Sequence, residues 1–358
     1  EIGDGHGPVV GFDGHEDIVA LGDAAKWDAD ALSAKIADGK MFGRGTTDMK
    51  SGLMAGVFAM IHLKENNVPL HGTLRLMATV GEEYGQFGAR QLAEAGYAKD
   101  LDTLIVGEPS GVVKQAVATP QIQQMLQINQ DSANKLMAAN QTTEQHFIEL
   151  AHKGSLTYTV SAQGVAAHSS MPEIGKNAID SLLTFYQKQQ AYFATITDKK
   201  NPVLGATVPV VTLIQGGEQI NTVPASASIS VKIRTIPEVP NTKLAADIQQ
   251  LIDELNANGE QLSLDIHSNL YPVHTADDAP VVKAAKEIGE TDLQQVLPLI
   301  GVPGGTDASS FVAVNPDIDV VVFGPGNITA HQVNEYVDLD MYHRFITIYE
   351  KMITRLLA

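Results

Sequence analysis

The sequence predicts an α/β protein of two domains. In the first and last thirds of the chain, short apolar runs typical of buried strands alternate with helical segments. The middle third differs, because its strands have one apolar and one polar face. The predicted order there is β-α-β-β-α-β, a split βαβ or ferredoxin-like α+β module. We therefore expect an α/β domain formed by residues 1–153 and 271–358, interrupted by a smaller domain at residues 154–270.

Composition excludes several classes of function. The 358 residues carry a formal net charge of −18, which argues against nucleic acid and anionic membranes as partners. The chain has no cysteine, so it has no disulfide, no thiol nucleophile and no thiolate metal site. No apolar run is long enough to span a bilayer. We expect a soluble protein of the cytoplasm.

The first domain opens with a predicted strand at residues 8–12, and His15 and Asp17 follow it. Residues two apart in an extended segment share a face, so the Asp17 carboxylate can orient the His15 ring as a metal ligand. A glycine-rich turn at residues 43–45 then precedes a long helix that runs to about residue 65. Asp48 lies at this turn, where it either caps the helix or binds cations.

Acidic residues recur at the ends of predicted buried strands. Glu82 and Glu83 follow the strand at residues 73–80, and Glu108 follows a short strand at residues 104–107. Chemistry in open α/β sheets collects at the carboxyl ends of strands. Acids placed there cost desolvation, so a purely structural role does not favour them.

The remaining elements complete both domains. Residues 115–150 are rich in Gln, Asn, Met and Ala and predict one or two amphipathic helices, which we interpret as a helical insertion. The smaller domain has predicted strands and helices between residues 155 and 267. The returning segment contains a strand at residues 320–323, a glycine-rich loop with His331, and a closing helix at about residues 339–357.

If these strand ends converge, five carboxylates share one crevice with His15 and His331. At an effective dielectric constant of ~20, each neighbouring pair of carboxylates would repel by several kcal/mol. Divalent cations would offset this repulsion, and mixed histidine and carboxylate ligands suit zinc, with cobalt or manganese as alternatives. One aspartate could bridge two such ions, and a spare carboxylate could act as a general base.

Five ordered motifs resemble those of the M20 metallopeptidases across nearly the whole chain. They are His15-x-Asp17, Gly43-Arg44-Gly45-x-x-Asp48-Met49-Lys50, Glu82-Glu83, Gly107-Glu108-Pro109 and Ala330-His331-Gln332-x-Asn334-Glu335. The resemblance implies a zinc-peptidase-like catalytic domain interrupted by a lid or dimerisation domain. It also implies that the chain forms a homodimer through the inserted domain.

The resemblance implies two divalent metal ions with defined ligands. His15 and Glu108 would hold one ion, Glu83 and His331 the other, and Asp48 would bridge both. Zinc is the ion most expected.

The resemblance also assigns catalytic roles. Asp17 would orient the first histidine. Glu82 would take the proton from the metal-bridging water that attacks the carbonyl, and hand it to the leaving amine. His168, in Gly164-x-Ala166-Ala167-His168, would stabilise the oxyanion in the partner subunit's site, although it could instead cap the following helix.

Substrate contacts are expected from both domains. Arg234 would clamp a substrate carboxylate, for which its planar guanidinium is suited. Asn221 belongs to a motif similar to the family's substrate-binding strands, and Gly305 with Thr306 would line the pocket for the acyl or carboxylate end.

The implied activity is hydrolysis of the amide of a small N-acylated amino acid, with N-succinyl-diaminopimelate favoured over N-acetylornithine. Cleavage of dipeptides or of C-terminal residues is an alternative within the same family. A function of another class, a non-catalytic or truncated and inactive binding protein, also stays open.

Overall fold

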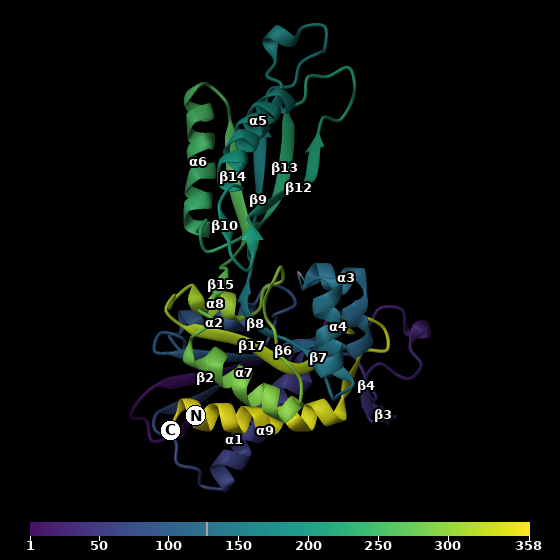
Figure 1. The fold of residues 1–358 in the computed structure, drawn as a ribbon. Coiled ribbons are helices and arrows are strands. Elements are labelled where there is room, and N and C mark those ends of the chain that lie inside the picture. Colours follow the sequence, from purple (N-terminus) through teal and green to yellow (C-terminus); the bar gives the residue numbers. More distant parts are fainter. Residues whose placement is uncertain (127) are drawn as a thin grey trace. The chain divides into compact units, whose positions relative to one another are not determined.

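A computed structural model describes residues 1–126 and 128–358 (Figure 1). It divides into two compact units. The first comprises Glu1–His152, Val273–Val302 and Thr306–Ala358, and the second comprises Lys153–Pro272 and Pro303–Gly305. Among the described residues, none of the helices combines the length and the apolar character needed to cross a membrane.

The first unit is built on a mixed sheet with strand order β1-β5-β2-β6-β17-β8-β15. Its strands are β1 (Ile2–Gly3), β2 (Val9–His15), β5 (Thr73–Thr79), β6 (Thr103–Val113), β8 (Ile148–His152), β15 (Val273–His274) and β17 (Asp319–Asn327), with β7 (Glu144–His146) beside β6 and β16 (Leu299–Val302) beside β8. Strands β5, β2, β6 and β17 run parallel to one another. Their carboxyl ends therefore meet at one edge of the sheet.

Helices cover both faces of this sheet. On one face, Met77, Val106 and Val322 pack against α2 (Phe87–Glu94) and α8 (Ala308–Val312). On the other face lie α1 (Ser51–Glu65), α7 (Pro280–Leu293) and α9 (Leu339–Leu356), where the rings of Phe12 and Tyr349 meet edge to face at 4.7 Å. The central strands are mostly apolar because helices cover both of their faces, and most of their polar residues lie toward the carboxyl ends.

A small second sheet lies beside the carboxyl edge of the first unit. Its strands are β3 (Lys35–Ala37), β4 (Lys40–Phe42) and β18 (Tyr336–Asp338), in the order β18-β4-β3. The short helical segment η1 (Ala24–Lys26) and the irregular turn η2 (Thr46–Lys50), in which Asp48 and Met49 have non-helical backbone angles, flank it. The pairing of β4 with β18 brings the loop before α1 against the loop after β17.

The expectation of a helical insertion over residues 115–150 is correct only for its first part. Segments η3 (Lys114–Ala118), α3 (Pro120–Met125) and α4 (Gln130–Ala139) are helical, and residue 127 lies outside the described residues. The later residues instead form β7 and β8, two strands of the main sheet. Periodicity alone does not distinguish a short apolar run in a strand from one in a helix.

The second unit has the expected β-α-β-β-α-β order. Its antiparallel sheet has the strand order β12-β13-β9-β14, formed by β9 (Gly154–Gln163), β12 (Val208–Gly216), β13 (Ser226–Thr235) and β14 (Leu262–Leu270). Helices α5 (Ala178–Ile196) and α6 (Asn241–Ala257) contact each other and β9, so they share one face. Shorter elements are η4 (Pro172–Ile174), β10 (Lys200–Asn201) and β11 (Gly205–Ala206). These findings confirm the predicted α/β fold class.

Candidate metal centre

Two groups of possible metal ligands lie at the carboxyl edge of the main sheet. The first contains His15, Asp48 and Glu108, and the second contains Asp48, Glu83 and His331. In each group the ligand atoms all lie within 4.8 Å of one another. The topology explains the convergence, because His15 ends β2, Glu83 follows β5, and Glu108 lies on β6.

Asp48 belongs to both groups. Its Oδ1 lies 3.1 Å from His15 Nε2, and its Oδ2 lies 3.1 Å from His331 Nε2. Glu108 Oε1 completes the first group at 3.5 Å from His15 Nε2, and Glu83 Oε1 completes the second at 2.9 Å from His331 Nε2. Histidine nitrogens and carboxylate oxygens are suitable ligands for zinc and similar divalent ions, so these residues fit a pair of bound cations that share Asp48.

Asp17 organises two parts of the site. Its Oδ1 accepts hydrogen bonds from the backbone N–H groups of Gly81 and Glu82, at 2.8 and 3.2 Å, and its Oδ2 accepts one from Glu83 at 3.3 Å. The Asp17 carbonyl oxygen lies 3.2 Å from His15 Nδ1. A single residue therefore holds both the histidine ring and the acidic turn that follows β5.

Glu82 is a carboxylate of this site that lies outside both ligand groups. Burial, followed by the charge of Asp307, raises the pKa of Glu82 to about 8. Gln86 Nε2 lies 3.5 Å from Glu82 Oε1 and donates to the Thr306 carbonyl at 2.7 Å. Glu82 can consequently hold a proton near neutral pH.

The electrostatics of the ligands reflect a crowded acidic site. Burial and the charge of Asp48 raise the pKa of Glu108 well above its usual value, and the same causes raise that of Glu83. Burial opposes protonation of His15, but its hydrogen bond to Asp48 raises the net pKa to about 9. The pKa of His331 is also raised to about 9, chiefly by its hydrogen bond to Asp48. Protons therefore offset part of the negative charge that cations would otherwise neutralise.

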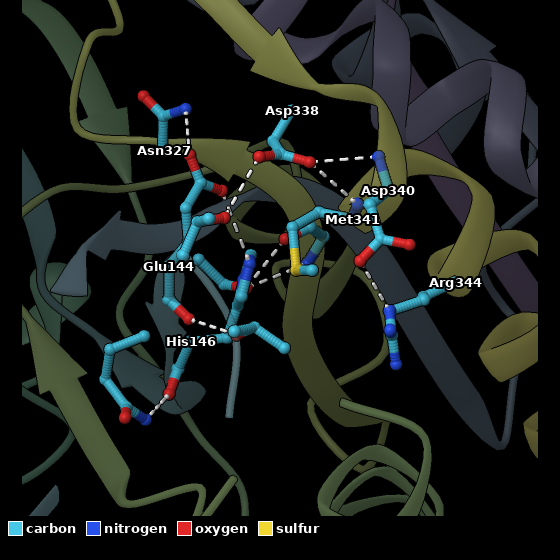
Figure 2. A network of polar contacts seen from close by, with 12 residues as sticks. Glu144, His146, Asn327, Asp338, Asp340, Met341 and Arg344 are labelled. Carbon is cyan, nitrogen blue, oxygen red and sulfur yellow. Dashed lines mark hydrogen bonds and ion pairs between the residues drawn. The ribbon is translucent and has the colours of Figure 1, made fainter. Parts of the chain in front are cut away.

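A polar network, buried around Glu144 and Asn327, lies next to the loop between β17 and β18 (Figure 2). Asn327, the last residue of β17, donates through Nδ2 to Glu144 Oε1 at 2.8 Å. Its backbone N–H donates to Thr47 Oγ1 at 2.9 Å. Asp338 Oδ1 accepts hydrogen bonds from the backbone N–H groups of Asp340, at 2.9 Å, and Met341, at 3.3 Å, and so caps α9. Asn327 Nδ2 also donates to the Tyr336 carbonyl at 3.1 Å, which ties the two ends of the loop together.

Two buried acids behind the site were not singled out by the sequence. Asp13 is 1% exposed, and its pKa is raised well above the usual value by burial and then by the charge of Asp307. Asp307 accepts a hydrogen bond from Thr79 Oγ1 at 2.5 Å, and burial raises its pKa to about 6. The available signal was the position of Asp13, an acid inside an apolar strand, two residues before His15 and so on the same face.

The predicted site residues are divided between the units. The first unit brings together His15, Asp17, Asp48, Glu82, Glu83, Glu108 and His331, and it also contains Thr306. His168, Asn221, Arg234 and Gly305 belong to the second unit.

Within the second unit, two of these residues are neighbours. His168 is exposed, its Nδ1 lies 2.7 Å from Ser170 Oγ, and the Ser169 N–H donates to the Asn221 carbonyl. Arg234 lies on β13 opposite Val208 of β12. The helix-capping alternative for His168 does not hold, because Asn177 caps α5 with its side chain.

A family model described as peptidase family M20/M25/M40 matches residues 11–355. A Staphylococcus aureus (strain MSSA476) protein is named probable succinyl-diaminopimelate desuccinylase. It is 37% identical over an alignment of 378 residues that covers 98% of this chain and 84% of that protein. A Psychrobacter protein (strain PRwf-1) named succinyl-diaminopimelate desuccinylase is 29% identical over 360 residues, covering 98% of this chain and 80% of that protein.

Solved structures share the fold. The M20 family metallo-carboxypeptidase Sso-CP2 from Sulfolobus solfataricus superposes with a TM-score of 0.69 at 19% identity, covering 98% of this chain and 85% of that one. The YXEP protein of Bacillus subtilis, described as a dinuclear metal binding peptidase from the M20 family, gives a TM-score of 0.64 at 16% identity, covering 99% and 83%.

Proposed function

The chain belongs to peptidase family M20/M25/M40 and is a metal-dependent amide hydrolase, and from this premise we propose that it removes the succinyl group from N-succinyl-diaminopimelate. The observation that carries the chemistry is Asp48, whose two carboxylate oxygens face two different histidines. The choice of substrate is supported by the names of the relatives at 37% and 29% identity.

We assign the ligands as the geometry groups them. His15 and Glu108 would hold one divalent cation, Glu83 and His331 a second, and Asp48 both, with zinc favoured by the ligand types. When bound, such a pair polarises a carbonyl oxygen and lowers the pKa of water toward ~7.

Glu82 is the proposed general base. It accepts a proton from the attacking water and later passes it to the departing amine nitrogen. A pKa raised by burial suits this role, because a base with a pKa near the working pH both accepts and returns the proton efficiently. Asp17 accepts a hydrogen bond from the backbone N–H of Glu82, which holds the turn that carries this carboxylate.

The second unit would supply substrate contacts and the surface through which two chains form a dimer. His168 would donate a hydrogen bond to the negative charge that develops on the carbonyl oxygen of the partner subunit's substrate. Arg234 would bind the substrate carboxylate, Asn221 would contribute to substrate binding, and Gly305 with Thr306 would line the pocket for the acyl or carboxylate end. The exposed apolar strand β12 supports a homodimer formed through this unit.

Hydrolysis of N-succinyl-diaminopimelate tests this proposal. The assay compares it with N-acetylornithine and with dipeptides, each with added zinc or cobalt and after chelation. We expect turnover of the succinyl substrate that disappears on chelation and returns with metal. Preference for N-acetylornithine or for a dipeptide would replace the substrate but keep the mechanism. Absence of both turnover and bound metal would overturn the two-metal site and leave a non-catalytic binding protein.

A further inference from the structure

Glu335 is a fully buried carboxylate next to the candidate metal centre, and it is not one of the proposed ligands. Its Oε1 accepts three backbone hydrogen bonds, from Gly45 at 2.9 Å, Thr47 at 3.0 Å and Asp48 at 3.1 Å. The loop before α1 therefore wraps its N–H groups around one oxygen atom. With the Asp48 backbone fixed on this side, its side chain extends to His15 and His331.

Arg44 makes the matching contacts to the other loop. Its Nη1 lies 2.5 Å from Glu335 Oε2 and donates to the Gln332 carbonyl at 3.1 Å, while its Nη2 donates to the His331 carbonyl at 3.3 Å. The side chain is 3% exposed, and its guanidinium lies 5.3 Å from the centre of the Trp27 ring. One buried cation thus links a backbone carbonyl of a proposed ligand to the carboxylate that holds Asp48.

The loop that Arg44 binds has an unusual backbone. His331 and Asn334 have φ angles of 65° and 58°, in the left-handed region that non-glycine residues seldom adopt. Such conformations persist where the surroundings fix them and are frequent at functional sites. The hydrogen bonds of Arg44 to the carbonyls of His331 and Gln332 supply this constraint.

Stability alone is a weak explanation for this ion pair. Replacing a buried ion pair by well-packed apolar residues is often neutral or stabilising, because desolvation of two charges offsets their attraction. An apolar pair could not accept hydrogen bonds from three backbone N–H groups and donate to two carbonyls at once. These contacts favour a role in positioning the two loops.

We infer that Arg44 and Glu335 are positioning residues that set the separation and orientation of the two ligand groups. Glu335 holds Asp48 through its backbone, and Arg44 holds His331 through its carbonyl. This inference rests on the proposed two-metal function. It predicts that the two residues affect different ligands, since Asp48 serves both groups and His331 only the second.

Metal binding by the purified full chain tests the inference without an activity assay. Zinc calorimetry and cobalt absorption spectra are measured for wild type, Glu335→Gln and Arg44→Lys. We expect Glu335→Gln to weaken both cation sites by about 10–100-fold, the usual effect of losing a partner that orients a metal ligand. Arg44→Lys keeps the positive charge beside Glu335 but loses the planar fork that also reaches the carbonyls of Gln332 and His331, so it should weaken mainly the second site.

Arg75→Met is the matched control. It removes an arginine that pairs with Asp100 at 2.6 Å in the same unit, on β5. We expect this variant to bind both cations as wild type does. Unchanged zinc affinities and cobalt spectra in folded Glu335→Gln and Arg44→Lys would overturn the inference and leave the proposed function standing. A wild-type chain that binds no cation would overturn the proposed function itself, and the inference with it.

Hydrogen exchange of the metal-free wild type decides the matter if a variant fails to fold. The three amides that Glu335 holds should exchange slowly, so a peptide covering residues 44–49 should be protected. Rapid exchange of that peptide in a folded chain would contradict the inference.

Discussion

The two carboxylate oxygens of Asp48 face different histidines, and this contact decides between two readings of the residue. From sequence, an aspartate before a long helix is equally a helix cap or a cation ligand. The structure gives Asp48 extended backbone angles, φ −121° and ψ 100°, and the residue before α1 is Lys50, which makes no side-chain cap. The side chain of Asp48 is therefore free to face the ligand groups.

Glu82→Gln tests the assignment of the general base. The amide keeps the shape of the side chain but cannot accept a proton, so kcat should fall by about 10²–10⁴-fold. Bound metal, measured by elemental analysis, should stay at the wild-type level. The adjacent Glu83→Gln is the control, because it should lose affinity for the second cation. A Glu82→Gln enzyme that works at the wild-type rate would assign the base elsewhere.

Sequence reasoning found the acids that follow strands and missed those whose role depends on tertiary contacts. Glu83 and Glu108 were predictable because each follows an apolar strand. The Arg44–Glu335 link joins residues 291 positions apart, and no local pattern predicts such a contact. Asp307 is similar, since its partner Thr79 lies 228 positions away in the chain.

At the scale of elements, alternation made the second unit predictable. Leu156, Tyr158 and Val160 of β9 are buried against the helices, while the intervening residues are partly exposed. Strand β8 has no such signal, because it lies inside the main sheet between β16 and β17. Its five residues include Glu149 and His152 and are too few to establish a period of two, so its place in the sheet is decided by its neighbours.

Strand β8 carries Glu149, and this residue predicts a pH dependence of stability. Glu149 is half-buried, and desolvation raises the pKa of its carboxyl to about 8. Between its ordinary pKa and about pH 8 the unfolded chain binds fewer protons at this residue than the folded chain. The free energy of unfolding therefore falls as the pH rises through this window. Glu149 contributes its full destabilisation above pH 8 and almost none at pH 4.

Glu149→Gln should remove that cost. We expect the variant to be more stable than wild type by about 1–4 kcal/mol at pH 8.5 and nearly equal at pH 4. Urea denaturation of the metal-free proteins at both pH values measures the difference. Glu94→Gln, on the exposed side of α2, is the control and should change little at either pH. A gain at pH 4 as large as that at pH 8.5 would exclude titration as the cause.

For the whole molecule, the edge of the second sheet predicts self-association. Val208, Val210, Leu213 and Ile214 of β12 are each 45–61% exposed, and the strand pairs with β13 on one side. An exposed apolar edge strand is a template for pairing with another chain. A twofold dimer would bury this edge, and it would also allow the exposed His168 to serve the partner's site.

Subunit exchange tests that arrangement. Glu82→Gln and His168→Ala should each be nearly inactive alone. After mixing and exchange, half of the dimers are hybrids, and one of the two sites in each hybrid has both native residues. We expect recovery of about one quarter of the wild-type activity. Mixing Glu82→Gln with Glu83→Gln is the control, because both residues lie in the same unit and no native site should form. Absence of recovery despite confirmed hybrids would place His168 in its own chain's site.

A ribosome releases the parts of this site at well-separated times. Four of the proposed ligands emerge early, namely His15, Asp48, Glu83 and Glu108. His331 is made only after the whole second unit, and so is β17, the strand that pairs with β6. Glu335, which holds the Asp48 loop, follows later still. The proposed ligand set is therefore incomplete in the nascent chain until residue 331 has left the ribosome.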